Sequence, residues 1–477
     1  MNRVRAAIAL EWTVQWRYRV PAVAVAVTAV WTVALSAMPD PVARGAGPLI
    51  LTIDTATFGS FFVAALVLFE RGEGAAAALA VSPLRFGEYL GAKVGTLTAL
   101  SAVSAVPVAL VSGVGPGTAL VGVVPLAVLF LVLNLALVTR HDSLVGFLTV
   151  APVLLVPLIA APLVHLSGVV DHPLLFLVPT TGAASVLRGG TGPVAFAGAM
   201  GYLLVAVAVG LWFARRSHRR SGVGVNRVRV PREHRRRWTR RGWLIALVDI
   251  DRRLAARSAL LTVVLAGPVL LAAALRLGYP PLAGYAHERF GVDLVPYQPV
   301  LLASLVVLHV PLIVGMVGAL LVLDDVDDHV VLVLRVSPVT MPRYLAYRAV
   351  AVAVVTAALL AVTVPLSGLA PDLSRTMPGL ALAAAQAPLV TLATAAFARN
   401  KVEGLAWLKI LGLLPTVIAP AVWWLPELAQ WPLRILPYYW TVDLLWRPGP
   451  LSLLAGLALT AVAVVLLSRR TLRRLNG

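Results

Sequence analysis

The sequence has no cysteine, few charged residues and none of the common nucleotide-binding or zinc-binding motifs. Without cysteine there are no disulfides, no thiolate metal sites and no cysteine nucleophiles. No G-x-x-x-x-G-K-[ST] occurs, so the chain lacks a phosphate-binding loop of that type with which to hydrolyse a nucleotide. H-E-x-x-H and the nucleophile elbow G-x-S-x-G are also missing. These absences predict a protein that is not an enzyme and that binds no cofactor itself.

Apolar sequence dominates instead. Hydrophobic residues make up 60% of the 477 residues and charged residues only 13%, a composition too apolar for a soluble protein of this size. Apolar runs of about twenty residues, long enough to cross ~30 Å of hydrocarbon as helix, recur about twelve times. We expect spans near 21–38, 49–69, 92–112, 117–138, 144–166, 194–214, 258–275, 299–323, 345–366, 378–398, 405–425 and 451–468. The fold class is therefore an all-α polytopic membrane protein with about 12 transmembrane helices.

Basic residues are unevenly distributed about these spans. With the amino terminus inside, most of the 40 Lys and Arg fall on inner segments. The outer segments keep Arg44, Arg188, Arg276, Arg289, Arg375, Arg434 and Arg447. This is the positive-inside pattern, so we expect a multi-pass plasma-membrane protein with both termini cytoplasmic. The net charge of +19 then favours membrane lipid over nucleic acid as the anionic partner.

A degraded repeat organises the chain, since segment 68–94 recurs as 323–349. A shift of 255 positions pairs Glu70 with Asp325, Glu73 with Asp328, Ser82 with Ser337, Pro83 with Pro338, Tyr89 with Tyr344 and Lys93 with Arg348. The repeat predicts a tandem duplication. We expect two parallel six-helix repeats at 1–216 and 242–477, joined by a basic cytoplasmic linker at 217–241.

Each copy of the repeat lies between the second and third span of its half, on the expected cytoplasmic side. A solvated loop would be enough to explain the charged residues. A free loop has no reason to keep the acid spacing, Ser-Pro and Tyr-Leu in two copies, so we favour a docking surface. A second candidate contact is the short turn between the fourth and fifth spans, which could also be only a turn. Its charged residues are Arg140 and Asp142 in the first half and Arg399, Lys401 and Glu403 in the second.

Two further features occur in both halves. Val4, Ile8, Trp12 and Trp16 fall four apart, which predicts an amphipathic helix along the inner membrane surface; Trp243, Leu247, Ile250 and Leu254 repeat it. Broken apolar stretches before the last spans carry Pro173 and Pro179 in one half, Pro432 and Pro437 in the other. These stretches suit a re-entrant or surface-lying pair of short helices rather than another crossing.

Few polar side chains lie within the spans. Asp54 falls about five residues from the outer end of span 49–69, ~7.5 Å of helix, where hydration from outside explains it as well as substrate contact. His309 is nearer the middle of its span, and a structural histidine is an alternative to a substrate contact there. Together with Asn134, these residues are the candidates for a substrate pathway. The spans lack the acids that a proton- or sodium-driven carrier usually needs at its coupling site.

The order of parts resembles the type-2 ABC exporter permeases, and among them the fluoroquinolone-export-like permeases. The likeness is carried by the surface helix, the acid-acid…Val-Ser-Pro…Tyr-Leu-x-x-[Lys/Arg] segment and the turn 400–404, Asn-Lys-Val-Glu-Gly. It covers nearly the whole chain, twice. Most such permeases are single six-span units, so this chain departs from the pattern in being fused.

The resemblance implies an ATP-driven exporter in which a separate ABC ATPase holds ATP and Mg and docks on the coupling segments. It assigns that contact to Glu70, Glu73, Ser82, Pro83, Tyr89 and Lys93, and to Asp325, Asp328, Ser337, Pro338, Tyr344 and Arg348. The fusion predicts two ATPase subunits per chain, and the weakly polar spans predict a hydrophobic or amphipathic small-molecule substrate. A secondary-active carrier of the major-facilitator kind is one alternative, although its loop motif is missing between spans two and three. A non-transporting membrane scaffold is the other.

Overall fold

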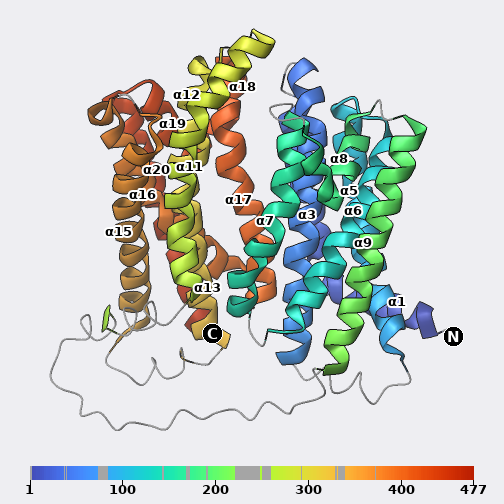
Figure 1. Cartoon of the computed structure of the whole chain (residues 1–477). Helices are drawn as coiled ribbons and strands as arrows, with labels where there is room; N and C mark the ends of the chain where they lie inside the picture. The colour runs from blue at the N-terminus through green and yellow to red at the C-terminus, as the bar shows by residue number, and fades with distance from the viewer. Residues whose placement is uncertain are drawn as a thin grey trace.

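The computed structural model describes most of the chain. The described residues are 3–36, 38, 40–72, 84–141, 144–167, 172–189, 192–220, 248–249, 259–291, 293–327, 330, 339–370 and 372–476. Helices account for nearly all of them, and no strand occurs among them. Both termini lie at the same end of the bundle (Figure 1), which we name the termini end.

The first half contains one short amphipathic helix, six long helices and one short buried helix. They are α1 (Arg3–Arg17), α2 (Val20–Ser36), α3 (Asp40–Gly72), α5 (Phe86–Val111), α6 (Pro116–Val138), α7 (Leu144–Ser167), α8 (Pro179–Arg188) and α9 (Pro193–Arg220). A 3₁₀ turn at Pro173–Leu177 precedes α8. Helices α1 and α2 meet at a bend of 65°, so α1 leaves the direction of the spans as the sequence predicts.

The second half repeats this order from its first long helix onward. Its elements are α11 (Ala259–Phe290), α12 (Gln298–Leu301), α13 (His309–Asp327), α15 (Met341–Ser367), α16 (Leu373–Phe397), α17 (Lys401–Trp424), α18 (Glu427–Gln430), α19 (Pro437–Trp446) and α20 (Pro450–Asn476). A π-helical stretch, Leu302–Val307, joins α12 to α13. The predicted amphipathic helix with Trp243 lies almost wholly outside the described residues.

Each predicted span lies within a long helix to within about two residues, except 299–323, which covers α12, the π-helical stretch and most of α13. By length and hydropathy, nine helices of the described residues can cross a membrane, and ten if the bent pair α1 and α2 counts as one span. Within α7, the described apolar stretch Val153–Leu166 is shorter than these helices. The all-α polytopic fold is therefore confirmed, whereas the count of twelve spans is not.

The fourth long helix occupies the centre of each half. In the first half α6 packs against α3, α5, α8 and α9; in the second, α16 packs against α13, α15, α19 and α20. Both central helices are uncharged along their buried length. Helix α16 is also rich in small residues, which allow neighbouring backbones to approach closely in a membrane. The two halves thus share one packing scheme.

The halves meet through their fifth long helices. Helix α17 packs against α2 and α3 of the first half, and α7 packs against α11 of the second. Figure 1 shows α7 and α17 between the two groups of helices. One apolar core runs across this boundary, from Leu66 of α3 to Leu312 of α13 and Ile418 of α17. A span of each half therefore contacts the beginning of the other half.

The broken stretches before the last spans form short helices in both halves, as predicted. Helix α8 is buried along most of its length, with Thr180, Ala183 and Leu187 all shielded, and it packs against α6, α7 and α9. A Cβ added at Gly122 of α6 would lie 2.5 Å from the Leu187 side chain. Such close packing supports the re-entrant alternative over a surface-lying one, because irregular backbone at membrane depth needs protein around it.

Candidate functional site

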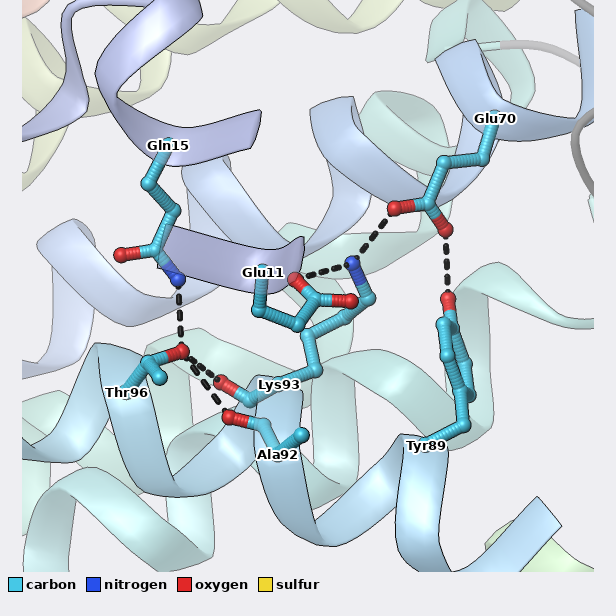
Figure 2. A network of polar contacts seen from close by, with 7 residues as sticks. All are labelled: Glu11, Gln15, Glu70, Tyr89, Ala92, Lys93 and Thr96. Carbon is cyan, nitrogen blue, oxygen red and sulfur yellow. Dashed lines mark hydrogen bonds and ion pairs between the residues drawn. The ribbon is translucent and has the colours of Figure 1, made fainter. Parts of the chain in front are cut away.

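Three residues of the first repeat come together where α3 ends and α5 begins. Glu70 lies in the last turn of α3, while Tyr89 and Lys93 lie four residues apart on one face of the first turns of α5. The Lys93 ammonium donates to Glu70 Oε1 at 2.7 Å and the Tyr89 hydroxyl donates to Glu70 Oε2 at 2.5 Å (Figure 2). The ammonium also lies 5.1 Å from the centre of the Tyr89 ring. We name Glu70, Tyr89 and Lys93 the first clamp.

Helix α1 supplies a second carboxylate to this clamp. Lys93 Nζ lies 2.9 Å from Glu11 Oε2, and the lysine side chain is 0% exposed. One turn further along α1, the Gln15 amide donates to the Thr96 hydroxyl at 2.7 Å (Figure 2). Burial raises the pKa of Glu11, although the neighbouring Lys93 ammonium acts in the opposite direction. The polar stripe of α1 therefore faces the protein.

The apolar face of α1 points the other way. Ile8, Trp12 and Trp16 are all more than two-fifths exposed, while Ala7, Glu11 and Gln15 are buried. An apolar face left uncovered beside the ends of spans suits a helix that rests on a membrane surface. The predicted helix is confirmed, and its place on the membrane stays a prediction.

The second repeat builds the same clamp. Asp325 lies in the last turn of α13, and Tyr344 and Arg348 lie four residues apart in the first turns of α15. The Tyr344 hydroxyl and Arg348 Nη2 both donate to Asp325 Oδ2, the latter at 2.9 Å. Arg348 Nε donates to the Tyr344 hydroxyl at 3.3 Å, and its guanidinium lies 5.3 Å from that ring. We name Asp325, Tyr344 and Arg348 the second clamp.

The two clamps differ in burial. Lys93 is wholly covered by the chain, whereas the side chains of Arg348 and Asp325 are 11% and 20% exposed. Each clamp ties the end of one long helix to the beginning of the next, around segments 73–83 and 331–338. Glu73, Ser82, Pro83, Asp328, Ser337 and Pro338 lie in or next to those segments, outside the described residues. The repeated residues that the structure describes thus bond within the chain, and their contact with a partner stays a prediction.

The second candidate contact is the short turn between the fourth and fifth spans. In the second half, this turn is the beginning of helix α17. Asn400 caps α17 by accepting the Glu403 backbone N–H at 3.0 Å, and Glu403 accepts the Arg399 backbone N–H at 2.8 Å. Glu403 is 5% exposed, so capping accounts for its place in the turn. In the first half, the exposed Arg140 stacks 4.5 Å from the Phe213 ring. Asp142 and the Lys401 side chain lie outside the described residues.

Asp54 contacts the other half of the chain. Helix α3 begins at Asp40 and has 33 residues, so it extends beyond the predicted start of the span at residue 49, and the depth of Asp54 in the membrane stays a prediction. Its carboxylate Oδ1 is 3.1 Å from the Lys409 ammonium of α17, in the other half of the chain. Lys409 was missed by sequence reasoning, although a lone base inside the apolar run of 405–414 was its signal.

The other two candidates for the substrate pathway are Asn134 and His309. Asn134 is buried, and its amide donates to the Phe130 carbonyl of its own helix at 2.7 Å. His309 is the first residue of α13, directly after the π-helical stretch. Among the described residues, no group of three His, Asp or Glu could hold a metal ion.

Comparison with known proteins finds a fluoroquinolones export permease family in each half. The Fluoroquinolones export permease protein family matches residues 2–224, and the Fluoroquinolones export permease protein Rv2686c-like family matches residues 251–469. The fluoroquinolones export permease protein Rv2686c of Mycobacterium tuberculosis H37Rv is 33% identical over 198 residues, 41% of this chain and 79% of that protein. Rv2687c of the same strain, named likewise, is 36% identical over 192 residues, 39% of this chain and 80% of that protein. No solved structure matches the chain.

These matches agree with the all-helical, membrane-spanning fold and with the duplication. Each half carries its own family match, and each of these relatives is matched over most of its length by about two-fifths of this chain. That is the relation expected between single permease units and a fusion of two. The chain belongs to the fluoroquinolones export permease family of transport proteins.

Proposed function

We propose that the chain is the membrane-spanning subunit of an ATP-driven ABC exporter, whose ATP is hydrolysed by separate ATPase subunits. The observation that supports this most is the clamp, built twice from the same types of residue at the same spacing. Each clamp holds both ends of a coupling segment, 73–83 or 331–338, at the termini end. In this proposal the termini end faces the cytoplasm, in accord with the positive-inside pattern.

The clamps give the coupling segments a mechanical connection to the spans. A force applied to segment 73–83 acts on α3 through Glu70 and on α5 through Tyr89 and Lys93, because these side chains are bonded to one another. Helix α1 is joined to the same point through Glu11. A docked ATPase could therefore move three helices of one half together, which is what coupling between ATP hydrolysis and transport requires.

We expect two ATPase subunits per chain, one at each coupling segment. The two contacts are not equivalent, since Lys93 of the first clamp is wholly buried whereas the Arg348 side chain of the second is 11% exposed. The cargo in this proposal is a hydrophobic or amphipathic drug-like compound, which the names of the relatives also favour. No step of the cycle needs a cofactor on this chain; ATP and Mg belong to the ATPase.

Transport should depend on ATP. We expect inverted vesicles that contain the chain and an ABC ATPase that co-purifies with it to accumulate a fluoroquinolone when ATP is added. A non-hydrolysable ATP analogue should abolish accumulation, and a protonophore should leave it unchanged. Uptake driven by a proton gradient without ATP would identify a secondary carrier instead. If ATP gives no uptake of any amphipathic compound, the scaffold alternative is favoured.

Reversing the charge at both coupling segments should release the ATPase. We expect the double substitution Glu73→Lys and Asp328→Lys to reduce co-purification of the ATPase at least about tenfold, because each pair of opposed charges at an interface becomes a repulsive one. The control is Asp40→Lys with Glu427→Lys, which reverses two exposed acids outside the coupling segments. Full retention of the complex by the first variant would contradict the docking assignment.

A further inference from the structure

An apolar cavity lies between the two halves, at the end of the bundle opposite the termini end. It has a volume of about 370 Å³ and is lined by α2 of the first half and by α17 with Leu433 and Leu436 of the second. Each lining residue is aliphatic, methionine, proline or tryptophan. Figure 1 places α18 and α19, which follow α17, far from both termini. We name this space the α2–α17 cavity.

The cavity borders the hydrocarbon of the membrane rather than water. Ala29 and Val33 belong to its lining, and they lie four residues apart on one face of α2. Both are exposed in the described part of the chain, Val33 by 67%. An exposed apolar face of a span contacts lipid, and an apolar cavity stays free of water. Acyl chains are therefore the material that has access to this space.

The length of the cavity matches one leaflet of a bilayer. Along α17 its lining runs from Leu414 to Trp424, the last residue of the helix. Ten residues correspond to ~15 Å of helix rise, half of the ~30 Å of hydrocarbon. Tryptophan is enriched where hydrocarbon meets the headgroups, and this end of the bundle carries Trp423, Trp424, Trp431 and Trp446. The cavity thus extends from headgroup level to about the middle of the membrane.

One hydrogen-bond donor in the lining calls for an acceptor. Trp31 lines the cavity, and its indole N–H is buried without a hydrogen-bond partner among the described residues. A buried donor without a partner is costly. Trp31 lies five residues before the end of α2 at Ser36, ~7.5 Å of helix rise, which is close to the level of the ester carbonyls of a phospholipid.

A cation lies at the headgroup end. Arg434 lies between the lining residues Leu433 and Leu436 in sequence, and its guanidinium is 4.8 Å from the centre of the Trp431 ring. Its Nε has no hydrogen-bond partner among the described residues. Guanidinium groups bind phosphate well. From the middle of the membrane outward, the order is apolar wall, N–H donor and cation, which is the order of acyl chain, ester and phosphate in a phospholipid.

We propose that the α2–α17 cavity binds one phospholipid from the leaflet at this end, as a resident part of the protein and not as its cargo. One acyl chain occupies the cavity, an ester carbonyl accepts the Trp31 N–H, and the phosphate pairs with Arg434. A small-molecule site has several placed polar groups, whereas indole N–H groups are the only polar side-chain groups in this lining. The inference goes beyond the proposed function and does not depend on any ATPase.

The resident lipid completes the contact between the halves on this side. It touches α2 of the first half and α17 of the second, and an empty space there would leave both walls without the dispersion contacts of a filled one. Removal of the lipid should therefore lower the melting temperature of the purified chain, and added phosphatidylglycerol should restore it.

The phospholipid that stays with the purified chain gives the direct test. We expect native mass spectrometry and phosphate analysis, after extensive washing in detergent, to find one phospholipid for each wild-type chain. Ala29→Phe places a phenyl ring in the space of the acyl chain and should retain at least about tenfold less lipid. The matched control is Ala22→Phe, the same change at an exposed position of α2 that does not line the cavity; it should retain lipid as the wild type does.

Two further variants test the polar contacts without filling the cavity. Trp31→Phe keeps an aromatic ring but removes the N–H, and it should lose lipid about three- to tenfold faster during washing, the effect of one hydrogen bond. Arg434→Gln should remove the preference for phosphatidylglycerol over diacylglycerol, which has no phosphate. Arg447→Gln, from an exposed ion pair at the same end, should keep that preference.

Three results would overturn the inference. They are a wild-type chain that retains no phospholipid, equal retention by Ala29→Phe and Ala22→Phe, and stoichiometric displacement of the lipid by a fluoroquinolone, which would make the cavity a cargo site. If Ala29→Phe is not monodisperse, the washing rate of Trp31→Phe decides, and a rate equal to that of the wild type contradicts the site. No assay here contains an ATPase, so these results and the test of ATP-driven transport succeed or fail separately.

Discussion

Replacement of Lys93 by methionine is expected to destabilise the protein by about 3–5 kcal/mol, the effect of removing one partner from a buried ion pair. Lys93 is wholly buried and compensates two carboxylates, those of Glu11 and Glu70, at 2.9 and 2.7 Å. Without it, the two acids face each other, and Tyr89 loses the cation beside its ring. Thermal unfolding of the detergent-purified chain, followed by tryptophan fluorescence, measures the loss.

Further variants show whether the loss comes from uncompensated charge. The triple substitution Glu11→Gln, Glu70→Gln and Lys93→Met removes the acids together with the base, and should recover most of the lost stability. Arg348→Met in the second clamp should cost less, about 1–3 kcal/mol, because its site is partly exposed. Arg44→Met, in an exposed surface pair, should change nothing measurable. If Lys93→Met changes the melting temperature as little as Arg44→Met does, the first clamp has no structural role.

The sequence predicted the repeat and therefore the residues of both clamps. Acid, tyrosine and base keep their spacing in two copies, and the spacing of 19 residues from Glu70 to Tyr89 recurs from Asp325 to Tyr344. The direction of the side chains could not be predicted in this way. A charged residue at the end of a span is equally compatible with water, a partner or its own chain. The burial of Lys93 depends on contacts that only the fold provides, among them the contact with Glu11 of α1.

Helix α1 shows the same limit. Its apolar period predicts the helix and its exposed face, but not the contacts that Glu11 and Gln15 make. Their partners, Lys93 and Thr96, are 82 and 81 residues away, and periodicity within a helix contains no information about such distant neighbours.

The ion pair between Asp54 and Lys409 could not be predicted from the sequence, for two physical reasons. Hydropathy placed the start of the second span at residue 49, because 40–48 is too polar to cross hydrocarbon, yet the helix begins at Asp40. The contact also joins two halves of the chain. A duplicated sequence shows that the halves resemble each other, while their mode of association depends on surfaces such as those of α7 and α17.

Substitution of Gly315 tests the packing scheme itself. Gly315 lies in α13, where a Cβ would be 2.7 Å from the backbone oxygen of Ala387 and 2.7 Å from Val390 Cβ, both in α16. The Thr391 hydroxyl of α16 donates to the Gly315 carbonyl at 2.8 Å, so the two backbones are held close together. Gly315→Ala should therefore cost about 1–3 kcal/mol by overpacking. Gly315→Val should prevent recovery of monodisperse protein, because α16 cannot move without disturbing every helix around it.

The matched control is Gly201→Ala in α9, where an added Cβ meets nothing within 4 Å. Alanine is preferred over glycine inside a helix by about 0.5–1 kcal/mol, so this variant should be neutral or slightly more stable. Size-exclusion profiles and melting temperatures of the three variants, compared with the wild type, give the result. A Gly315→Val protein that is monodisperse and melts with the wild type would show that α13 and α16 do not touch at this position. If Gly315→Ala and Gly201→Ala both lowered the melting temperature, the protein would be generally intolerant to added methyl groups. The crossing of α13 over α16 would then no longer explain the effect.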